Sequence, residues 1–203
     1  MSNQTTPPEN TTPLTPKEWA NPTPAGLVAL AVACFCFFAM LNGYLEASGL
    51  KLIGCWLLGG FVVQLVVGLL DLKSGNLPGG NTFLFFSAFF MLVGGLEMLV
   101  KADAIAAGNP ADGLVDGYAW LALTVVLLLW TPAFCKKFTL LSLIVLALDV
   151  ALPFITLIDL RVLSADWKPV PAYALLISGV IAIYFSAALV VNGTFGKKVY
   201  PVL

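Results

Sequence analysis

The sequence predicts an all-α integral membrane protein with six transmembrane helices. Of its 203 residues, 60% are hydrophobic and only 10% are charged. This composition excludes a soluble globular domain and a disordered chain. Six stretches of the chain also carry almost no charge. Each is close in length to the roughly 20 apolar residues that a helix needs to cross a hydrocarbon core about 30 Å thick. Since backbone polar groups find no water in lipid, each stretch is expected to be helical.

The six expected spans follow one another with short connections. In chain order they cover residues 24–44, 52–70, 82–100, 118–134, 138–158 and 172–193. Together they make residues 21–203 a single six-helix membrane domain. The first three helices would run opposite to the last three, which is compatible with the inverted three-plus-three arrangement of many transporters. The two halves show no convincing sequence repeat.

The boundaries of the spans carry local signals. Asn21 can cap the first turn of the first helix, and Pro22 and Pro24 suit a helix start because proline lacks an N–H. The second loop, residues 71–81, is packed with turn residues, and the third, residues 101–117, is the longest and most acidic. The small residues within the spans favour close helix packing: Gly59, Gly60, Gly68, Gly94, Gly95 and Gly179.

Residues 1–20 precede the first span. They are rich in Thr, Pro, Asn and Gln and are expected to form a disordered tail. The tail lacks the charged region and apolar core of a signal peptide.

The distribution of Lys and Arg predicts the orientation. The end that holds both termini carries Lys17, Lys73, Lys136, Lys137, Lys197 and Lys198, and the other end carries Lys51, Lys101, Arg161 and Lys168. This bias places both termini in the cytoplasm of a multi-pass cell-membrane protein.

Two acidic residues inside the spans are candidates for proton coupling, because intramembrane ionisable groups usually serve function. Glu97 lies near the end of the third span and Asp149 in the middle of the fifth. An alternative for Glu97 is an interfacial ion pair with Lys101, four residues later. For Asp149, hydrogen-bonded packing stays equally open.

The other polar groups within or opening the spans are uncharged, among them Gln64, Asn81, Thr82 and Tyr184. Every Lys and Arg is expected at a span end or in a loop, so the interior should offer no fixed cation. An anionic solute would then be held by helix N-termini, backbone N–H groups and amides. The chain has no His, and no metal, cofactor, nucleic-acid or catalytic constellation is expected.

Segments at both ends of the membrane domain resemble one family. Residues 21–27, Asn-Pro-Thr-Pro-Ala-Gly-Leu, resemble the Asn-Pro-Ala-Pro-Leu-Gly-Leu signature of the acetate uptake transporter family, which includes bacterial succinate–acetate permeases and fungal acetate permeases. The closing pattern of that family is matched by Ala182, Ile183, Tyr184, Asn192, Phe195, Gly196, Lys197, Val199 and Pro201. Between these segments, Gly59, Gly60, Gln64, Gly68 and Asp71 fit the second helix of the family, and Gly80, Asn81, Thr82 and Phe83 fit the entry to the third.

The resemblance implies a six-helix protomer, often in a hexamer, with one narrow pathway per protomer for acetate and similar monocarboxylates, and for succinate in some members. It also implies a hydrophobic constriction formed by Phe, Tyr and Leu in the family. Counted from the matching motifs, these positions fall on Leu30, Met91 and Leu143. The expected substrate-binding set is Asn21, Pro24, Leu30, Gln64, Asn81, Thr82, Met91, Leu143 and Tyr184.

The leading hypothesis is therefore a transporter or channel for acetate and related small monocarboxylates, with proton symport and passive conduction both open. A channel for a small neutral solute, such as urea, an amide or an undissociated acid, is the alternative. A sensor or assembly protein with an inactive pore has less support, and an intramembrane enzyme has the least.

Overall fold

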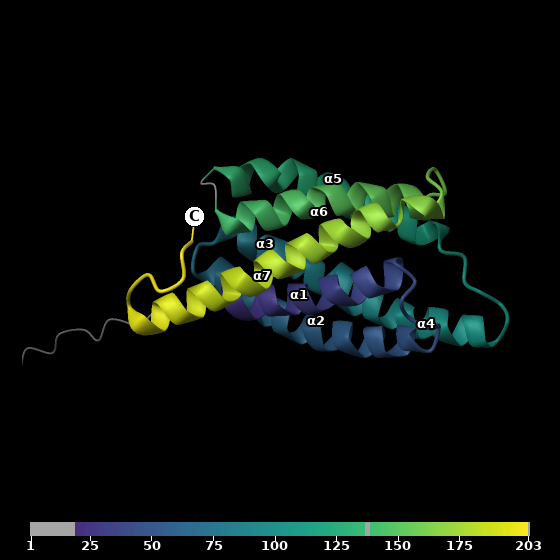
Figure 1. Cartoon of the computed structure of the whole chain (residues 1–203), viewed down its shortest axis with the longest axis horizontal. Helices are drawn as coiled ribbons and strands as arrows, with labels where there is room; N and C mark the ends of the chain where they lie inside the picture. The colour runs from purple at the N-terminus through teal and green to yellow at the C-terminus, as the bar shows by residue number, and fades with distance from the viewer. Residues whose placement is uncertain (1–18, 137–138, 203) are drawn as a thin grey trace, which may run out of the picture.

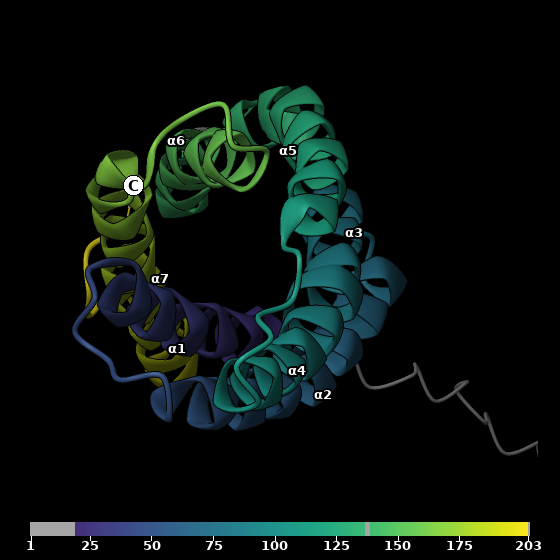
Figure 2. The same ribbon diagram turned by 90° about the vertical axis from the view of Figure 1, so that its right-hand side faces the viewer.

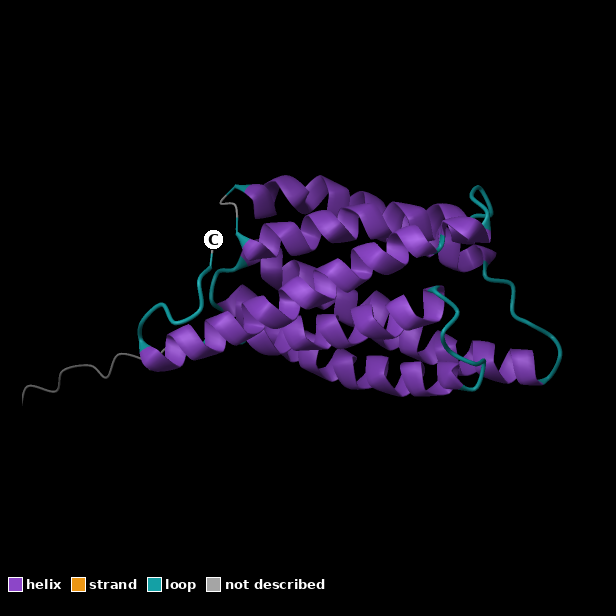
Figure 3. Ribbon diagram, viewed as in Figure 1, coloured by secondary structure: helices purple, strands orange, loops and turns teal. Residues whose placement is uncertain are grey.

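The structure, a computed structural model, describes residues 19–136 and 139–202, and these contain helices and loops without a strand (Figure 3). Six helical spans are long and apolar enough to cross a membrane, as the sequence predicts. The first, second, fourth and fifth are α1 (Thr23–Leu41), α2 (Gly49–Lys73), α5 (Leu114–Cys135) and α6 (Leu140–Asp159). The sixth is α7 (Pro169–Phe195), which a short 3-10 turn, η2 (Ala165–Trp167), precedes.

The third span is longer than the sequence predicts and is not regular. It runs through α3 (Leu77–Phe85), a π-helical segment η1 (Phe86–Val93) and α4 (Gly94–Ala106) without a break. It therefore begins at Leu77 rather than at residue 82 and ends at Ala106 rather than at residue 100. At 30 residues, it extends about 45 Å and exceeds the hydrocarbon core of a bilayer.

The spans form a ring around the long axis of the molecule (Figures 1 and 2). Helix α1 packs against α2 and α7, α7 packs against α6, and α6 packs against α5. The third span lies along α2, and α3 closes the ring against α5 through the most sparsely packed seam. Both described ends of the chain lie at the same end of the bundle (Figure 1).

Glycines set the closest approach between helices. A Cβ atom on Gly54 of α2 would lie 2.8 Å from the carbonyl oxygen of Gly95, and one on Gly117 of α5 would lie 2.7 Å from the backbone nitrogen of Leu160. Both distances are below van der Waals contact, so only glycine fits these positions. The expected packing role of Gly95 thus has a direct structural basis.

A buried carboxylate ties three helix ends together at the end of the bundle that holds the termini. Asp71 is 1% exposed. Its carboxylate accepts hydrogen bonds from the Thr23 hydroxyl at 3.1 Å and from Nδ2 of Asn76 at 2.9 Å. Asn76 in turn caps α3 by accepting from the N–H of Gly79. The starts of α1 and α3 are thereby fixed to the end of α2.

The C-terminal segment folds back along α7. The chain leaves the helix at Gly196, whose φ of 60° is left-handed and suits glycine. Oδ1 of Asn192 then accepts from the N–H groups of Val199 and Tyr200, and Nδ2 of Asn192 donates to the Tyr200 carbonyl. The closing motif therefore holds this segment in place. The predicted N-terminal tail falls almost wholly on residues 1–18, outside the described part of the chain.

Candidate functional site

Two cavities lie along the axis of the ring, one toward each end. The larger, about 120 Å³, lies opposite the termini, among the later turns of α1 and α6, the segment η1, and the first turns of α4, α5 and α7. The smaller, about 30 Å³, lies among the starts of α1, α3 and α6, on the side of the termini. Both cavities lie inside the ring of helices and share part of their lining.

Three apolar side chains line both cavities and therefore form the wall between them. They are Leu30 of α1, Phe86 of η1 and Leu148 of α6, and all three are buried. A carboxylate has no hydrogen-bond donor at such a wall, so an anion crossing it would lose its hydration without replacement. We call this set the apolar wall.

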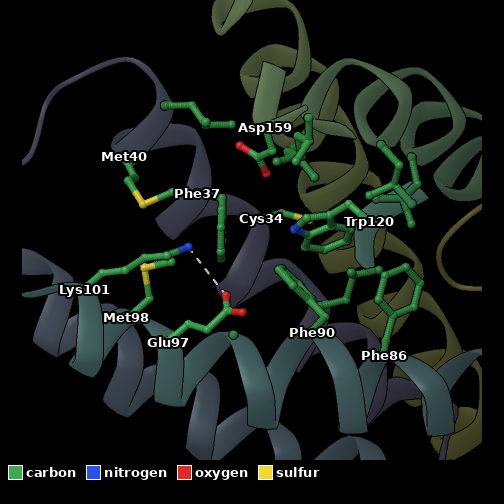
Figure 4. A pocket seen from close by; sticks show the side chains of 17 residues that line it. Cys34, Phe37, Met40, Phe86, Phe90, Glu97, Met98, Lys101, Trp120 and Asp159 are labelled. Carbon is green, nitrogen blue, oxygen red and sulfur yellow. Dashed lines mark ion pairs between the residues drawn. The ribbon is translucent and has the colours of Figure 1, made fainter. Parts of the chain in front are cut away.

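The π-helical segment positions the aromatic part of the wall. Phe86 stacks on Phe85 with ring centroids 4.4 Å apart and meets the edge of Phe90 at 5.9 Å. Phe90 contacts Phe37 and Trp120 at 5.1 and 5.6 Å, so aromatic rings line the larger cavity from three spans (Figure 4). A wide π turn shifts every later side chain around the helix axis and is frequent at functional sites.

Of the expected constriction, the structure brings only Leu30 to the wall. Met91 is fully buried but lines neither cavity: it faces α2, where a Cβ atom on Gly60 would lie 2.9 Å from its sulfur. Leu143 also lines neither cavity, because the inward stripe of α6 runs through Ile144, Leu148 and positions further along. Phe86 and Leu148 occupy this level instead.

The larger cavity contains a cation, contrary to the expectation of a cation-free interior. Lys101 lies inside α4, because the third span continues to Ala106, and its side chain is 30% exposed. Its ammonium pairs with Asp116 of α5 at 2.5 Å and with Glu97 at 3.6 Å. Glu97, Lys101 and Asp159 all line the cavity (Figure 4). The predicted pair between Glu97 and Lys101 is present.

The smaller cavity offers polar groups without charge. Gln64 is 1% exposed, and its Nε2 makes a long hydrogen bond of 3.5 Å to the Gly26 carbonyl. Among the described residues, its Oε1 atom and the hydroxyl of Thr82 are buried and have no hydrogen-bond partner. Both residues line this cavity, as do Thr23 and Asn76. A buried polar atom without a partner is costly, so these two atoms are suited to a polar ligand or water.

Four other expected binding residues lie away from both cavities. Asn21 is exposed, and its Oδ1 atom accepts from the N–H of Thr23, while the N-cap of α1 is Pro22 rather than Asn21. The Pro24 carbonyl accepts from Ser186, and Nδ2 of Asn81 donates to Leu77 within α3. Tyr184 is exposed and donates to the Pro201 carbonyl. The structure thus gives these residues contacts within or between helices, or with the C-terminal segment.

The start of the third span also differs from the expectation that Asn81 and Thr82 open it. The N-cap is Asn76, so the donors of the helix start lie one turn earlier. The Asp71 carboxylate accepts from Asn76 and from Thr23, the first residue of α1. The Asp71 carboxylate, an anion of the protein itself, therefore already lies at the starts of α1 and α3 and opposes binding of a solute anion there.

Asp149 faces α5 and lines neither cavity. Its Oδ2 atom lies 2.7 Å from the Thr131 hydroxyl, while Oδ1 is buried with no partner in the described part of the chain. This placement fits the packing interpretation better than contact with a solute.

Sequence reasoning missed Phe86, Trp120, Leu148 and Asp159. The cavity stripe of α6, at residues 144, 148, 152, 155 and 159, follows helical spacing and was available as a signal. Phe86 and Phe90 carry no such signal, since an apolar run gives no sign of a π turn.

Comparison with known proteins identifies the family to which the chain belongs. Residues 3–200 match the model of the GPR1/FUN34/yaaH family. The chain belongs to this family. The match confirms the family resemblance of the terminal motifs, and it covers the described helices from α1 to α7.

Relatives and a solved structure agree with the assignment to the GPR1/FUN34/yaaH family. The chain is 28% identical over 185 residues to proteins named succinate-acetate/proton symporter SatP, from Escherichia coli K12 and from Shigella flexneri. The alignment covers 90% of this chain and 95% of each relative. A structure of the bacterial acetate channel SatP matches with a TM-score of 0.75 and 22% identity, covering 91% of this chain and 99% of that one. This likeness confirms the six-helix fold.

Proposed function

We propose that this protein carries acetate and related small monocarboxylates across a membrane, through the path that the two cavities mark. The observation that carries the proposal is the apolar wall of Leu30, Phe86 and Leu148, with a cavity on each side. A relative named as a succinate-acetate/proton symporter and a structural neighbour titled an acetate channel support the same substrate class.

The dimensions of the path favour a small solute. The two cavities hold about 120 and 30 Å³, which suits a molecule of a few heavy atoms. The larger cavity supplies apolar walls for a short alkyl group and Lys101 for a carboxylate. Past the apolar wall, Gln64 and Thr82 supply uncharged hydrogen-bonding groups. The solute sheds water at the wall and regains polar contacts beyond it.

The predicted orientation, with the termini in the cytoplasm, agrees with how the basic residues are paired. At the opposite end, Lys51, Lys101 and Arg161 form ion pairs with carboxylates. Among the described residues at the end with the termini, no ion pair involves Lys73, Lys136, Lys197 or Lys198. The positive-inside rule counts Lys and Arg rather than net charge, and the sequence has six of them at the end with the termini against four at the other, which supports a cytoplasmic location for the termini. The larger cavity would then face outward.

The assembly proposed from the family resemblance is a homohexamer with one path per protomer. Mass spectrometry of the detergent-solubilised protein tests it by the mass of the complex. The proposed transport route lies within one protomer and does not depend on this number.

Uptake of labelled acetate by proteoliposomes tests the proposal. Protein-free vesicles give the leak of undissociated acid, which is subtracted. Protein-dependent uptake that unlabelled propionate inhibits and urea does not is the expected result. Inhibition by urea without inhibition by propionate would favour the neutral-solute channel, and no protein-dependent uptake would exclude acetate as the substrate.

A further inference from the structure

The charged residues of the larger cavity suggest how a carboxylate is loaded into the path. Lys101 has three N–H donors. One donates to Asp116 at 2.5 Å, and the Glu97 carboxylate, at 3.6 Å, is beyond hydrogen-bonding distance. The Lys101 side chain is partly exposed and lines the cavity (Figure 4). Lys101 can therefore donate a hydrogen bond to a second carboxylate that approaches from the cavity.

The position of Lys101 suits an entry site. The 30-residue third span has its midpoint at residues 91–92, and Lys101 lies about 14 Å from this midpoint along the helix, toward the end opposite the termini. The apolar wall begins at Phe86, on the other side of this midpoint. A solute bound at Lys101 would have entered the bundle without yet crossing the wall.

The acids around Lys101 oppose the binding of an anion by itself. Glu97 is on the same helix, Asp116 comes from α5 and Asp159 from α6, and the ammonium of Lys101 balances only one of the three. Lys168, before α7, adds a positive charge near Asp159, and the titratable group that α1 presents is the Cys34 thiol. A carboxylate that enters without a proton would place a further negative charge in this cluster.

Glu97 is the acid that can leave Lys101. Asp116 is buried, lies closest to the ammonium, and is held at the start of α5 where Gly117 packs on α6. Glu97 is more distant from the ammonium, and its side chain is 33% exposed within the cavity. It can therefore turn away from Lys101 while the ion pair between Lys101 and Asp116 stays in place.

We propose that the solute carboxylate takes the place of Glu97 on Lys101, and that Glu97 takes up one proton from the buffered solution as it is displaced. This inference rests on the proposed function. Lys101 then holds the solute beside the protonated Glu97. The proton passes from the Glu97 carboxyl to the solute carboxylate, which leaves as the neutral acid, and the Glu97 carboxylate returns to Lys101. One anion and one proton thus enter together, and the neutral acid crosses the apolar wall.

The smaller cavity is consistent with this sequence of steps. Oε1 of Gln64 is a hydrogen-bond acceptor that needs a donor, and the neutral acid brings an O–H group. The nearby Asp71 carboxylate, which Thr23 and Asn76 hold, opposes an anion at this end.

The test is the number of protons taken up for each acetate bound. Calorimetric titration of the detergent-solubilised full chain with acetate, in two buffers of different ionisation enthalpy at neutral pH, gives this number directly. The expected result is one proton per acetate for the native protein and none for Glu97→Gln. Asp103→Asn is the matched control: Asp103 is also on α4 but is exposed, pairs with Lys51 and does not line the cavity. Asp103→Asn should still take up one proton for each acetate bound.

Lys101 is tested by affinity. Lys101→Arg should retain acetate binding, and Lys101→Met should weaken it about tenfold or more, as the loss of one charged hydrogen bond predicts. Since Lys101→Met alone leaves Asp116 without a partner, the double variant Lys101→Met/Asp116→Asn should show the same loss while keeping the fold.

Two results would overturn the inference while leaving the proposed function intact. Acetate transport by a native protein that takes up no proton would show that binding is not linked to Glu97. One proton per acetate in Glu97→Gln would show that the solute brings its own proton. If the native protein neither binds nor transports acetate, the proposed function itself fails.

Discussion

Replacing Gly117 with alanine perturbs the contact that holds α5 against the end of α6. The new Cβ atom would lie 2.7 Å from the backbone nitrogen of Leu160 and 2.9 Å from the carbonyl carbon of Asp159. Both are backbone atoms, so no side-chain rotation relieves the overlap. An ordinary contact of about 3.5 Å requires the helices to separate by about 0.8 Å.

Overpacking of this kind costs about 1–3 kcal/mol. For a chain of this length, 1 kcal/mol corresponds to a shift in the melting temperature of about 2–4 °C. We therefore expect Gly117→Ala to melt about 2–12 °C lower than the native protein in detergent. The preceding residue, Asp116, moves with the helix, so its ion pair with Lys101 should also weaken.

Gly59→Ala is the matched control. No atom lies within 4 Å of a Cβ built on Gly59, which is in the middle of α2, and alanine favours a helix over glycine by about 0.5–1 kcal/mol. Its melting temperature should stay level or rise slightly. If Gly117→Ala melts at or above the temperature of Gly59→Ala, the close packing of α5 on α6 is refuted.

Three further predictions concern Asp149, Asp71 and Asn192. Asp149→Asn should keep acetate uptake and its pH profile within about twofold, because the residue lines neither cavity. If uptake by this variant no longer depended on pH, Asp149 would be the acid that couples proton and acetate transport. Asp71→Ala should lower the free energy of unfolding by about 1–3 kcal/mol, since Thr23 and Asn76 lose their acceptor, and a detergent melt at the native temperature would contradict this. Asn192→Ala should release the C-terminal segment and speed tryptic cleavage after Lys198 with uptake unchanged, whereas an unaltered cleavage rate would show that other contacts hold the segment.

The number and order of the spans could be predicted from the sequence, because a bilayer demands a fixed length of apolar helix and charged residues interrupt it. The family followed from motifs at both ends of the domain. The structure explains several family residues as packing: Asp71, between the terminal motifs, fixes the helix starts, and Asn192 and Tyr184 of the closing motif hold the C-terminal segment. Such motifs identify a fold without identifying a binding site.

The end of the third span was harder to predict. Lys101 and Asp103 resemble the start of a polar loop, yet no helix-breaking residue occurs before Gly108, and the helix continues to Ala106. The continuation carries Lys101 into the larger cavity. A rule that assigns charged residues to loops therefore missed the cation most relevant to a carboxylate.

The residues of the constriction were harder to predict than the end of the third span. Counting from Asn81 to Met91 assumes that every residue turns the helix by the same angle. The π-helical segment, Phe86–Val93, breaks this regularity, and Met91 within it faces Gly60 of α2 instead of a cavity. Only tertiary structure reveals such a shift.

Passage of small carboxylates through the apolar wall is tested by comparing Phe86→Ala with Phe89→Ala. Both residues lie in the same π-helical segment, but Phe86 is buried in the wall and Phe89 is exposed on the outer face of the bundle. The measurement is the rate of butyrate uptake relative to acetate uptake in proteoliposomes. Phe86→Ala should raise this ratio about tenfold or more, because a hydrophobic site discriminates by about 1–3 kcal/mol for each methylene. Phe89→Ala should leave the ratio unchanged. Equal ratios in a folded Phe86→Ala and Phe89→Ala would contradict a route through the wall.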